Sequence, residues 1–280
     1  VKKDDLVVLE LASWQLQGWG ESKISPHVAV FTTIFPDHMN YYKSMTEYIA
    51  DKKFIYKFQT ANDFCVLNID NPDVKKLAST VKSKKVFSSA KDLPTDWQLK
   101  IPGEHNRENA AIALAVGKIY GLTDEQMKDT ICNFGGLEHR LEVVRELNGI
   151  TFINDTTATT PVAGIKALSS IAPPIVLIAG GATKKLALDE FAKKICERVK
   201  AVALLEGTAT DELESEIKKN NGDRLIIGRF NKFNDAIERA VSIALPGDTI
   251  LLAPGCASFG MFKNEFDRGE QFKKLVKQLQ

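Results

Sequence analysis

The stretch IVLIAGGATKK, residues 175–185, decides how the second half of this chain folds. Its first five residues, Ile175–Ala179, are apolar without a break, which is typical of a strand buried in a parallel sheet. Two glycines follow, and glycines at a strand-to-helix turn let the backbone come close to a ligand. The spacing is not G-x-G-x-x-G, so a dinucleotide site is disfavoured. The stretch predicts a buried strand and, more weakly, a binding loop.

Strand-like runs alternate with segments of helical periodicity on both sides of this stretch. This alternation predicts an α/β fold with parallel sheets and crossover helices. The expected strands are Leu6–Leu11, Val28–Ile34, Cys65–Asn68, Ile175–Ala179, Ala201–Leu205 and Thr249–Ala253. The expected helices are Met45–Phe58, Asn106–Tyr120, Glu125–Phe134, Pro161–Ile171, Asp189–Val199, Asp211–Lys219, Asp235–Ala244 and Lys263–Leu279.

The pattern from Asn154 onward is doubly wound and complete in itself. We place the domain boundary near Gly135–Glu138, which gives one domain over residues 1–137 and a second over residues 138–280. The first half is less complete, since it opens on Val1 rather than Met and is already inside an apolar run at Leu6. We interpret the chain as N-terminally truncated.

Composition narrows the class of protein and its partners. Lys and Arg number 37 and Asp and Glu 36, so no net field favours nucleic acid or an anionic membrane. There is no targeting segment, and no apolar run approaches the roughly twenty residues that a membrane span needs. The four cysteines are scattered without a C-x-x-C pair, which argues against a disulfide framework or a structural zinc site. We therefore expect a cytoplasmic protein without nucleic-acid or membrane partners.

Two polar residues stand out in the first half. Glu10 lies within a strand-like apolar run, where an ionised carboxylate is costly unless it is paired or bound to a cation. A solvent-facing edge residue and a magnesium ligand at a strand end are equally compatible with this position. His38 follows Asp37 after the next expected strand. A histidine in such a loop is more often a hydrogen-bonding residue than a metal ligand.

Lys52 lies on the apolar stripe of the helix expected over Met45–Phe58, four residues after Tyr48 and three before Ile55. Its neighbour Lys53 lies off this stripe. From the pattern alone, a lysine that extends its amine to solvent is the better interpretation. The alternative is a desolvated, neutral amine, which can take up carbon dioxide and become an anionic carbamate that binds metal.

Taken in chain order, several segments resemble motifs of the Mur ligase family, and the resemblance covers essentially the whole chain. Each spacing is loose by itself, but their shared order is specific. The segments are Leu9–Leu16 (LELASWQL), Asp37-His38-Met39, Gly103-Glu104-His105-Asn106 with Asn109, Glu138-His139-Arg140 and Asn154-Asp155. The resemblance implies a partial central ATP-binding domain and a complete Rossmann-like C-terminal domain.

The resemblance also implies roles for these residues. Two Mg²⁺ ions would be held by Glu10, His38 and a carbamylated Lys52. Lys52, His38 and Arg140 would be the catalytic residues. ATP would contact Asn106, Asn109, His139, Arg140 and Asp155, with Asp155 on the ribose.

The C-terminal end of the chain indicates the branch of the family. PGCASFGMFKN, residues 254–264, and Asp267-Arg268-Gly269 resemble the branch that adds D-glutamate, and the D-N-P-R signature of another branch is missing. This implies that Lys184 and Ser258 bind the D-glutamate carboxylates. The remaining substrate contacts implied are Gln15, Thr159 and Phe259. Two departures are Thr157, where a lysine is common, and Glu265-Phe266, where the aromatic residue has moved by one position.

The implied reaction is ATP-driven amide formation between UDP-N-acetylmuramoyl-L-alanine and D-glutamate through an acyl phosphate, in peptidoglycan precursor synthesis. Its partners would be these small molecules, and the protein would be a monomer. The chain contains no G-x-x-x-x-G-K-[ST] phosphate-binding loop, so the 280 residues alone are expected to be inactive. Two alternatives stay open: another ATP-dependent amide ligase of the Mur or folylpolyglutamate type, and a shortened, non-catalytic binding protein of the same fold.

Overall fold

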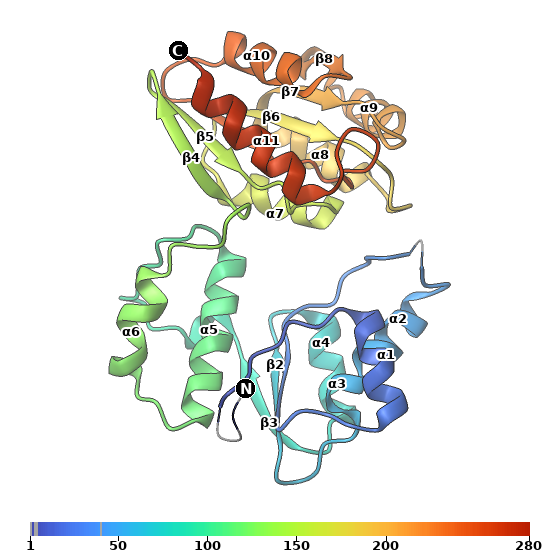
Figure 1. The fold of residues 1–280 in the computed structure, drawn as a ribbon, viewed down its shortest axis with the longest axis vertical. Coiled ribbons are helices and arrows are strands. Elements are labelled where there is room, and N and C mark those ends of the chain that lie inside the picture. The colour runs from blue at the N-terminus through green and yellow to red at the C-terminus, as the bar shows by residue number, and fades with distance from the viewer. Residues whose placement is uncertain (1, 3–4, 40) are drawn as a thin grey trace. The chain divides into compact units, whose positions relative to one another are not determined.

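The computed structural model describes residues 2, 5–39 and 41–280, and the chain divides into two compact units. The N-terminal unit comprises Val1–Trp97 and Glu108–Asp129, and the C-terminal unit comprises Gln98–Arg107 and Thr130–Gln280. Figure 1 shows the elements of both units. No helix in the described part of the chain is long and apolar enough to cross a membrane.

The N-terminal unit is built on a three-stranded parallel sheet in the order β1-β2-β3. Its strands are β1 Val28–Phe31, β2 Phe64–Asn68 and β3 Lys84–Ser88. Its helices are α1 Ser13–Ser22, α2 Met45–Lys52, α3 Phe54–Lys57 and α4 Pro72–Leu77, while α5 Glu104–Ile119 and α6 Asp124–Asn133 contribute residues to both units. The core combines apolar side chains of β1 and β2 with residues of α3 and α4.

Two sequence expectations in this unit were wrong. Leu6–Leu11 is not a strand, and the side chains of Leu6, Val7, Val8 and Leu9 are exposed. Extended backbone becomes a strand only through pairing, and none of the described strands pairs with this segment. The helix expected over Met45–Phe58 is interrupted at Lys53, which ends α2 and precedes α3.

The C-terminal unit contains a six-stranded sheet in the order β4-β5-β9-β6-β7-β8, in which only the β4–β5 pair is antiparallel. The strands are β4 Glu142–Leu147, β5 Ile150–Asn154, β6 Ile175–Gly180, β7 Val199–Leu205, β8 Ile226–Phe230 and β9 Thr249–Leu252. The helices are α7 Pro161–Ser170, α8 Asp189–Arg198, α9 Thr210–Lys219, α10 Phe233–Ile243 and α11 Glu265–Gln278.

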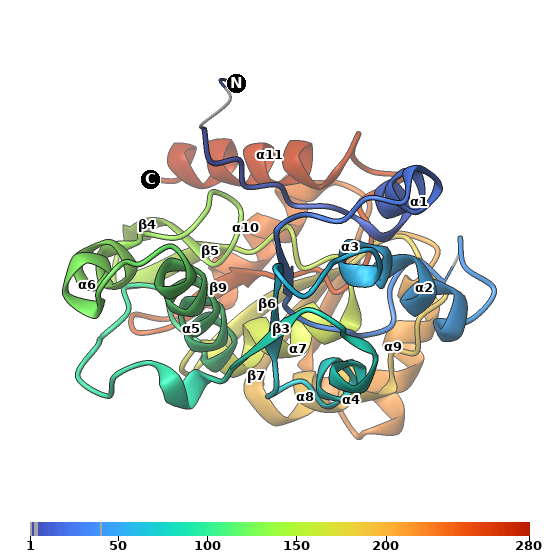
Figure 2. The same ribbon diagram turned by 90° about the horizontal axis from the view of Figure 1, so that it is seen from below.

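Helices cover both faces of this sheet, so the expected doubly wound α/β arrangement is confirmed. Figure 2 shows α10 and α11 on one side of the sheet and α7, α8 and α9 on the other. The central strand β6 is buried at every position, and its successive residues face the two cores alternately. Leu177 belongs to the core under α8, whereas Val176 and Ile178 belong to the core under α10 and α11.

The topology determines where a ligand site can form. Strands β5, β9, β6 and β7 are adjacent and parallel, so the loops that follow them leave the sheet at one edge. In open α/β sheets ligands bind at this carboxyl edge. Helix α7 begins beside it, because the Thr160 side chain accepts a hydrogen bond from the Ala163 amide at 3.3 Å and Pro161 occupies the first turn.

Phe191 of α8 provides a test of how the core supports these loops. Its fully buried ring lies where a side chain on Gly164 or Gly255 would be, so it contacts both α7 and the loop after β9. Phe191→Ala is expected to lower the free energy of unfolding of this unit by about 3–5 kcal/mol, because it leaves a cavity. The exposed Leu245 is the matched control, and Leu245→Ala is expected to change the free energy of unfolding by under about 0.5 kcal/mol. Urea denaturation measures both, and similar losses would contradict the packing described.

Candidate functional site

Four loops at the carboxyl edge of the C-terminal sheet surround a small pocket. They follow β5, β6, β7 and β9, and the start of α7 and the segment before α8 complete the wall. The lining residues are Thr159, Pro161, Ala182, Thr183, Lys184, Leu186, Leu188, Ala209, Gly255 and Cys256. The wall is therefore largely apolar, with one amine and a few hydroxyl groups on it, as in many small-molecule sites.

The loops after β6 and β9 approach each other so closely that only glycine fits between them. The amide of Ala182 donates to the carbonyl of Ala257 at 2.9 Å, and the reverse bond has the same length. A Cβ on Gly181 would lie 2.4 Å from the Ala257 carbonyl oxygen, and the φ angle of Gly181 is 133°. This is the physical reason for the second glycine in the stretch 175–185.

Lys184 brings a positive charge to this pocket. Its Nζ donates to the hydroxyl of Thr159 at 3.1 Å, which fixes the amine against the loop after β5. The Ser258 hydroxyl is buried and has no hydrogen-bond partner among the described residues. A buried hydroxyl without a partner costs free energy, so its presence here calls for an explanation. Phe259, the next residue, is 64% exposed.

Asn154 and Asp155 end β5 in a buried position. The Leu141 amide donates to Asp155 Oδ1 at 3.1 Å, while Arg140 lies close enough to interact through its charge. Burial raises the pKa of Asp155 from its ordinary 3.8 to about 6, and both the Leu141 hydrogen bond and Arg140 oppose this shift. The Arg140 side chain is exposed. A buried acid and an exposed cation are thus adjacent at the start of the C-terminal unit.

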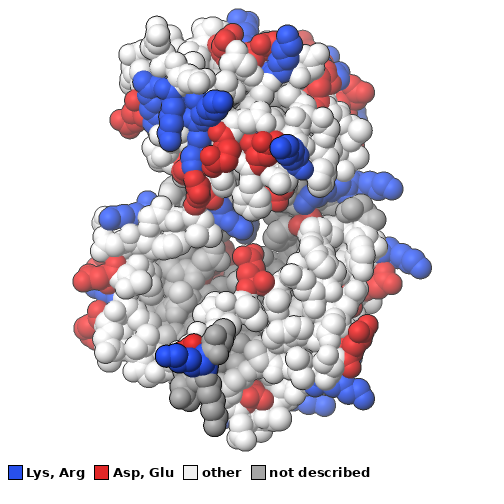
Figure 3. Space-filling view, viewed as in Figure 1, with Lys and Arg blue, Asp and Glu red and all other residues white. Residues whose placement is uncertain are grey.

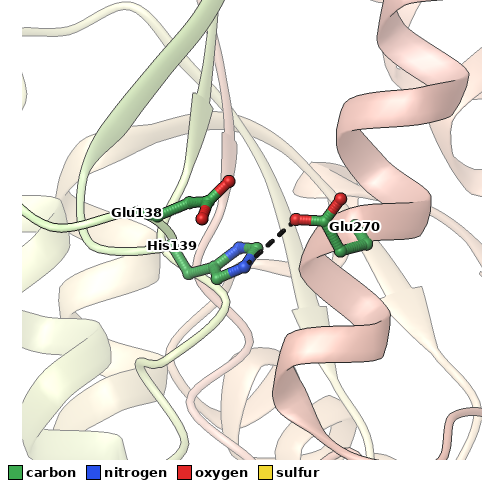
Figure 4. Close-up of side chains that lie close together, drawn as sticks. All are labelled: Glu138, His139 and Glu270. Atoms are coloured by element: carbon green, nitrogen blue, oxygen red, sulfur yellow. Dashed lines mark ion pairs between the residues drawn. The ribbon is translucent and has the colours of Figure 1, made fainter.

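His139 is buried and organises the chain before β4. Its Nδ1 lies 3.0 Å from Asn154 Nδ2, and its Nε2 lies 3.3 Å from a Glu270 carboxylate oxygen, the contact drawn in Figure 4. The Thr157 hydroxyl donates to the His139 carbonyl at 2.9 Å. Thr157, which replaces a common lysine, therefore has a structural contact. The shifted aromatic Phe266 packs edge-on against the His139 ring, with centroids 5.7 Å apart.

Glu138, His139 and Glu270 lie close enough together to suggest a metal site (Figure 4). The Lys273 ammonium group, however, forms ion pairs with Glu138, with Glu270 at 3.4 Å and with Glu142 at 3.1 Å. These carboxylates therefore already have a cation. In Figure 3 basic side chains gather near the C-terminal part of α11 with acidic ones beside them, which fits an ion-pair network rather than a metal centre.

A second constellation lies in the N-terminal unit, around the loop that follows β1. His38 has a φ of 57°, and its Nε2 lies 3.3 Å from Asp37 Oδ2. The Trp14 ring of α1 meets the His38 ring edge-on at 4.6 Å. Burial lowers the pKa of the Lys52 amine, and the nearby Asp37 carboxylate partly opposes this. The structure thus brings His38 and Lys52 to the same carboxylate, and Lys52 Nζ also lies 4.9 Å from the Tyr48 ring.

The other residues singled out from the sequence have simpler surroundings. Glu10 is exposed in the unpaired segment before α1, and Gln15 accepts a hydrogen bond from the Ala12 amide at 2.7 Å. Asn106 donates to the Pro102 carbonyl at 2.6 Å at the start of α5. Asn109, one turn further along the same helix, is exposed.

The sequence reasoning missed the buried Arg268 and the cation Lys273. Both lie on α11, where the helical pattern alone predicts a solvated charged face. The Asp267-Arg268-Gly269 motif pointed to the part of α11 that contains Arg268. In this motif Gly269 lets α11 lie against His139, whose ring would be 2.4 Å from a Cβ added at Gly269. No local signal marks Lys273.

Two models of known protein families match parts of this chain. Residues 1–98 match the Mur ligase middle domain, and residues 139–256 match the Mur ligase glutamate ligase domain. A UDP-N-acetylmuramoylalanine--D-glutamate ligase of Roseiflexus sp. (strain RS-1) is 40% identical over 96% of this chain and 65% of its own length. The corresponding ligase of Symbiobacterium thermophilum is 35% identical over 100% of this chain and 66% of its own. The chain thus spans about two thirds of the length of these relatives.

Solved structures share the fold at low sequence identity. The MurF ligase of Thermotoga maritima, crystallised with ADP, has a TM-score of 0.67 at 17% identity and covers 96% of this chain and 66% of its own. The Mycobacterium tuberculosis folylpolyglutamate synthase, complexed with ADP and AMPPCP, gives 0.69 at 17% identity over 92% of this chain and 65% of its own. At this identity the likeness concerns the fold alone.

The buried Asp155 makes stability depend on pH in a defined direction. Because folding raises its pKa from 3.8 to about 6, its stabilising contribution is complete below about pH 3.8 and is lost as the pH rises through about 6. Asp155→Asn keeps an acceptor for the Leu141 amide but cannot ionise. The variant should therefore gain up to about 3 kcal/mol relative to the parent between pH 4 and pH 7.

Urea denaturation of parent and variant at several pH values measures this gain. The exposed Asp223 is the control, since removing a solvent-exposed carboxylate should change the free energy of unfolding far less than Asp155→Asn does. A pH-independent difference between Asp155→Asn and the parent would show that the Asp155 carboxyl group is not desolvated.

Proposed function

Because the chain belongs to the Mur ligase family, we propose that it acts in the ATP-dependent joining of D-glutamate to UDP-N-acetylmuramoyl-L-alanine. Relatives 33–40% identical to it carry the name of that ligase. The single observation that carries the proposal is the pocket of the C-terminal unit, where the Lys184 amine, held by Thr159, lies at a largely apolar wall. The buried Ser258 hydroxyl, which has no hydrogen-bond partner among the described residues, follows two residues after the pocket-lining Cys256. The proposal takes residues 1–137 and 138–280 as its two functional domains.

The pocket suits a small dicarboxylic amino acid. Lys184 offers a charge-assisted hydrogen bond to one carboxylate, and the Ser258 hydroxyl offers a neutral one. Thr159 orients the amine through its hydroxyl, and the exposed Phe259 ring lies next to Ser258 in the chain, where it can cover a bound ligand. The apolar wall between these groups accommodates the methylene carbons of the ligand.

The nucleotide is assigned to the start of the C-terminal unit and of α5. With a pKa of about 6, Asp155 is mostly ionised at neutral pH and accepts hydrogen bonds from ribose hydroxyls. The exposed Arg140 provides a cation for phosphate oxygens, while buried His139 holds this segment in place. Asn106 and Asn109 complete the assignment. The ADP in the structures of relatives supports nucleotide binding by this fold.

The His38 and Lys52 constellation fits a cation site under one condition. As an ammonium, Lys52 would repel Mg²⁺, but burial lowers the pKa of its amine and so favours the neutral form that takes up carbon dioxide. The carbamate, His38 and the exposed Glu10 would then hold two Mg²⁺ ions, which neutralise charge on phosphate oxygens when bound. Gln15 is assigned to the muramoyl end of the acceptor.

In the proposed reaction the acceptor carboxylate attacks the γ-phosphorus of ATP, and ADP leaves. The D-glutamate amine then attacks the acyl carbon, phosphate leaves and the amine loses a proton. Catalysis of this kind depends mainly on positioning and charge stabilisation. Lys184 and Ser258 would orient the amine, and Arg140 would stabilise charge on the transferred group. The protein would work as a cytoplasmic monomer on small-molecule substrates.

Lys184→Ala tests the amino-acid pocket. Losing one partner of a charge-assisted contact costs about 2–5 kcal/mol, so the KM for D-glutamate should rise at least about tenfold while the KM for ATP changes far less. The matched control is the exposed neighbour Lys185, and Lys185→Ala should leave both constants within about twofold. Ser258→Ala should act like Lys184→Ala but more weakly.

The assay measures phosphate release by the protein expressed from its full coding sequence, because the 280 residues contain no phosphate-binding loop. A panel of other amino acids belongs in the same experiment. Stronger release with a different amino acid would replace D-glutamate in the proposal. A Lys184→Ala variant impaired for ATP but not for D-glutamate would move the glycine turn to the nucleotide site.

Lys52→Ala tests the constellation of the N-terminal unit. If a carbamate is the required group, the variant should lose most activity, at least about a hundredfold, and millimolar acetate or formate should restore part of it by occupying the vacated space. Lys53→Ala is the control and should lose little activity. Equal losses at the two lysines, or no rescue by small acids, would argue against a carboxylate-like group at position 52.

A further inference from the structure

Arg268 is the largest fully buried side chain among the described residues, with 0% exposure in the first turn of α11. Its Nε donates to the Thr156 hydroxyl at 2.9 Å, and one terminal nitrogen donates to the Thr156 carbonyl at 2.8 Å. The other terminal nitrogen lies 3.5 Å from the Cys256 carbonyl. Its guanidinium carbon lies 5.9 Å from the centre of the Phe262 ring. All these partners are neutral.

The energetics of this arrangement point away from stability alone. Within the described part of the chain Arg268 forms no ion pair with a carboxylate, although burial lowers its pKa only to about 10 and leaves it charged at neutral pH. Desolvating a charge is costly, and hydrophobic side chains of similar size often serve as well or better in such positions. The role of the buried guanidinium therefore lies in the two segments that its hydrogen bonds connect.

Arg268 connects two of the loops that form the pocket. Thr156 lies in the loop after β5, three residues before Thr159, whose hydroxyl receives the Lys184 amine. Cys256 lies in the loop after β9, lines the pocket and stands two residues before the unpartnered Ser258 hydroxyl. We propose that Arg268 is a positioning residue for the amino-acid pocket, whose planar guanidinium holds the loops after β5 and β9 at a fixed separation. The pocket's ligand, but not the positioning itself, rests on the proposed function.

The planar fork matters more than the charge for this role. Its nitrogens diverge at fixed angles, so it donates to both loops at once. A lysine ammonium at the same position is a compact donor on a flexible stem and cannot reproduce this geometry. Arg268→Lys should consequently behave like Arg268→Met rather than like the parent.

Arg145, which lies on β4, offers a matched control because it contacts the same helix. One of its terminal nitrogens also donates to backbone carbonyls, those of Val276, Lys277 and Leu279, but at the C-terminal end of α11 and away from the pocket. A purely structural role for Arg268 would be to dock α11, and Arg145 shares that role. Arg145→Met therefore separates docking of the helix from positioning of the pocket.

The first measurement is steady-state kinetics of Arg268→Met, Arg268→Lys and Arg145→Met in the protein expressed from its full coding sequence. Both Arg268 variants should raise the KM for D-glutamate at least about tenfold and leave the KM for ATP within about twofold. Arg145→Met should change neither constant by more than about twofold, whatever its effect on the melting temperature. Normal kinetics in Arg268→Lys would show that charge alone suffices and would overturn the positioning role.

The second measurement does not depend on the proposed function. The Cys256 thiol is buried in the pocket wall, so its alkylation by iodoacetamide, quantified by peptide mass spectrometry, reports how often the loop after β9 opens. Arg268→Met should speed this alkylation at least about tenfold, while Cys65, which is buried in the N-terminal unit, keeps its rate. Unchanged alkylation of Cys256 would overturn the inference even if D-glutamate supports no phosphate release.

If Arg268→Met fails to fold, Thr156→Val provides the same test from the other side. It removes the hydroxyl that accepts from Nε at nearly constant volume. It should raise both the Cys256 alkylation rate and the KM for D-glutamate at least about threefold. Parent-like values for this variant would also overturn the inference.

Discussion

The C-terminal unit depends on one close approach, between the glycine turn after β6 and the loop after β9. β6 and β9 are neighbours in the sheet, so their following loops leave it side by side. Two backbone hydrogen bonds between Ala182 and Ala257 then hold the loops together, and Gly181 provides the space for them. The pocket wall forms only because these loops meet.

The remaining walls of the pocket are attached to this contact through backbone groups. The Ala209 amide of the loop after β7 donates to the Gly181 carbonyl at 3.0 Å, and the Gly255 amide donates to the Ala158 carbonyl at 2.8 Å. The loops after β5, β6, β7 and β9 are therefore one hydrogen-bonded assembly. The position of a polar group on any one of these loops, such as the Lys184 amine, therefore depends on the hydrogen bonds that join all four loops.

Much of the C-terminal fold could be predicted from the sequence, because its signals are local. The unbroken apolar run of β6 and the amphipathic α8 need no knowledge of distant residues. The β4–β5 hairpin was missed although Asn148-Gly149, both with positive φ, is a strong two-residue turn signal. The strand expected at Leu6–Leu11 failed for the opposite reason, since strand formation depends on a pairing partner that local sequence does not encode.

The candidate site divides in the same way. Burial of Lys52 was among the interpretations of its helical stripe, and the lowered pKa of its amine agrees with that reading. The contacts of His139 with Asn154 and Glu270 could not be predicted, because they join residues 15 and 131 positions apart. Family resemblance gave candidates for the ligand contacts, but it gave no reason for the buried residues that hold them. Those reasons lie in the tertiary contacts.

The buried polar residues around the pocket are better understood as constraints on geometry than as sources of stability. Asn154 and Arg268 are fully desolvated, and Asp155 is nearly so, each at a cost that an apolar side chain would avoid. Their hydrogen bonds are directional, so they specify where backbone carbonyls and amides lie in a way that apolar packing does not. The apolar cores under α8 and α10 provide the stability that allows this. The apolar cores of the sheet stabilise the unit enough to offset the cost of burying these polar groups, and the hydrogen bonds of the polar groups fix the positions of a few ligand-binding groups.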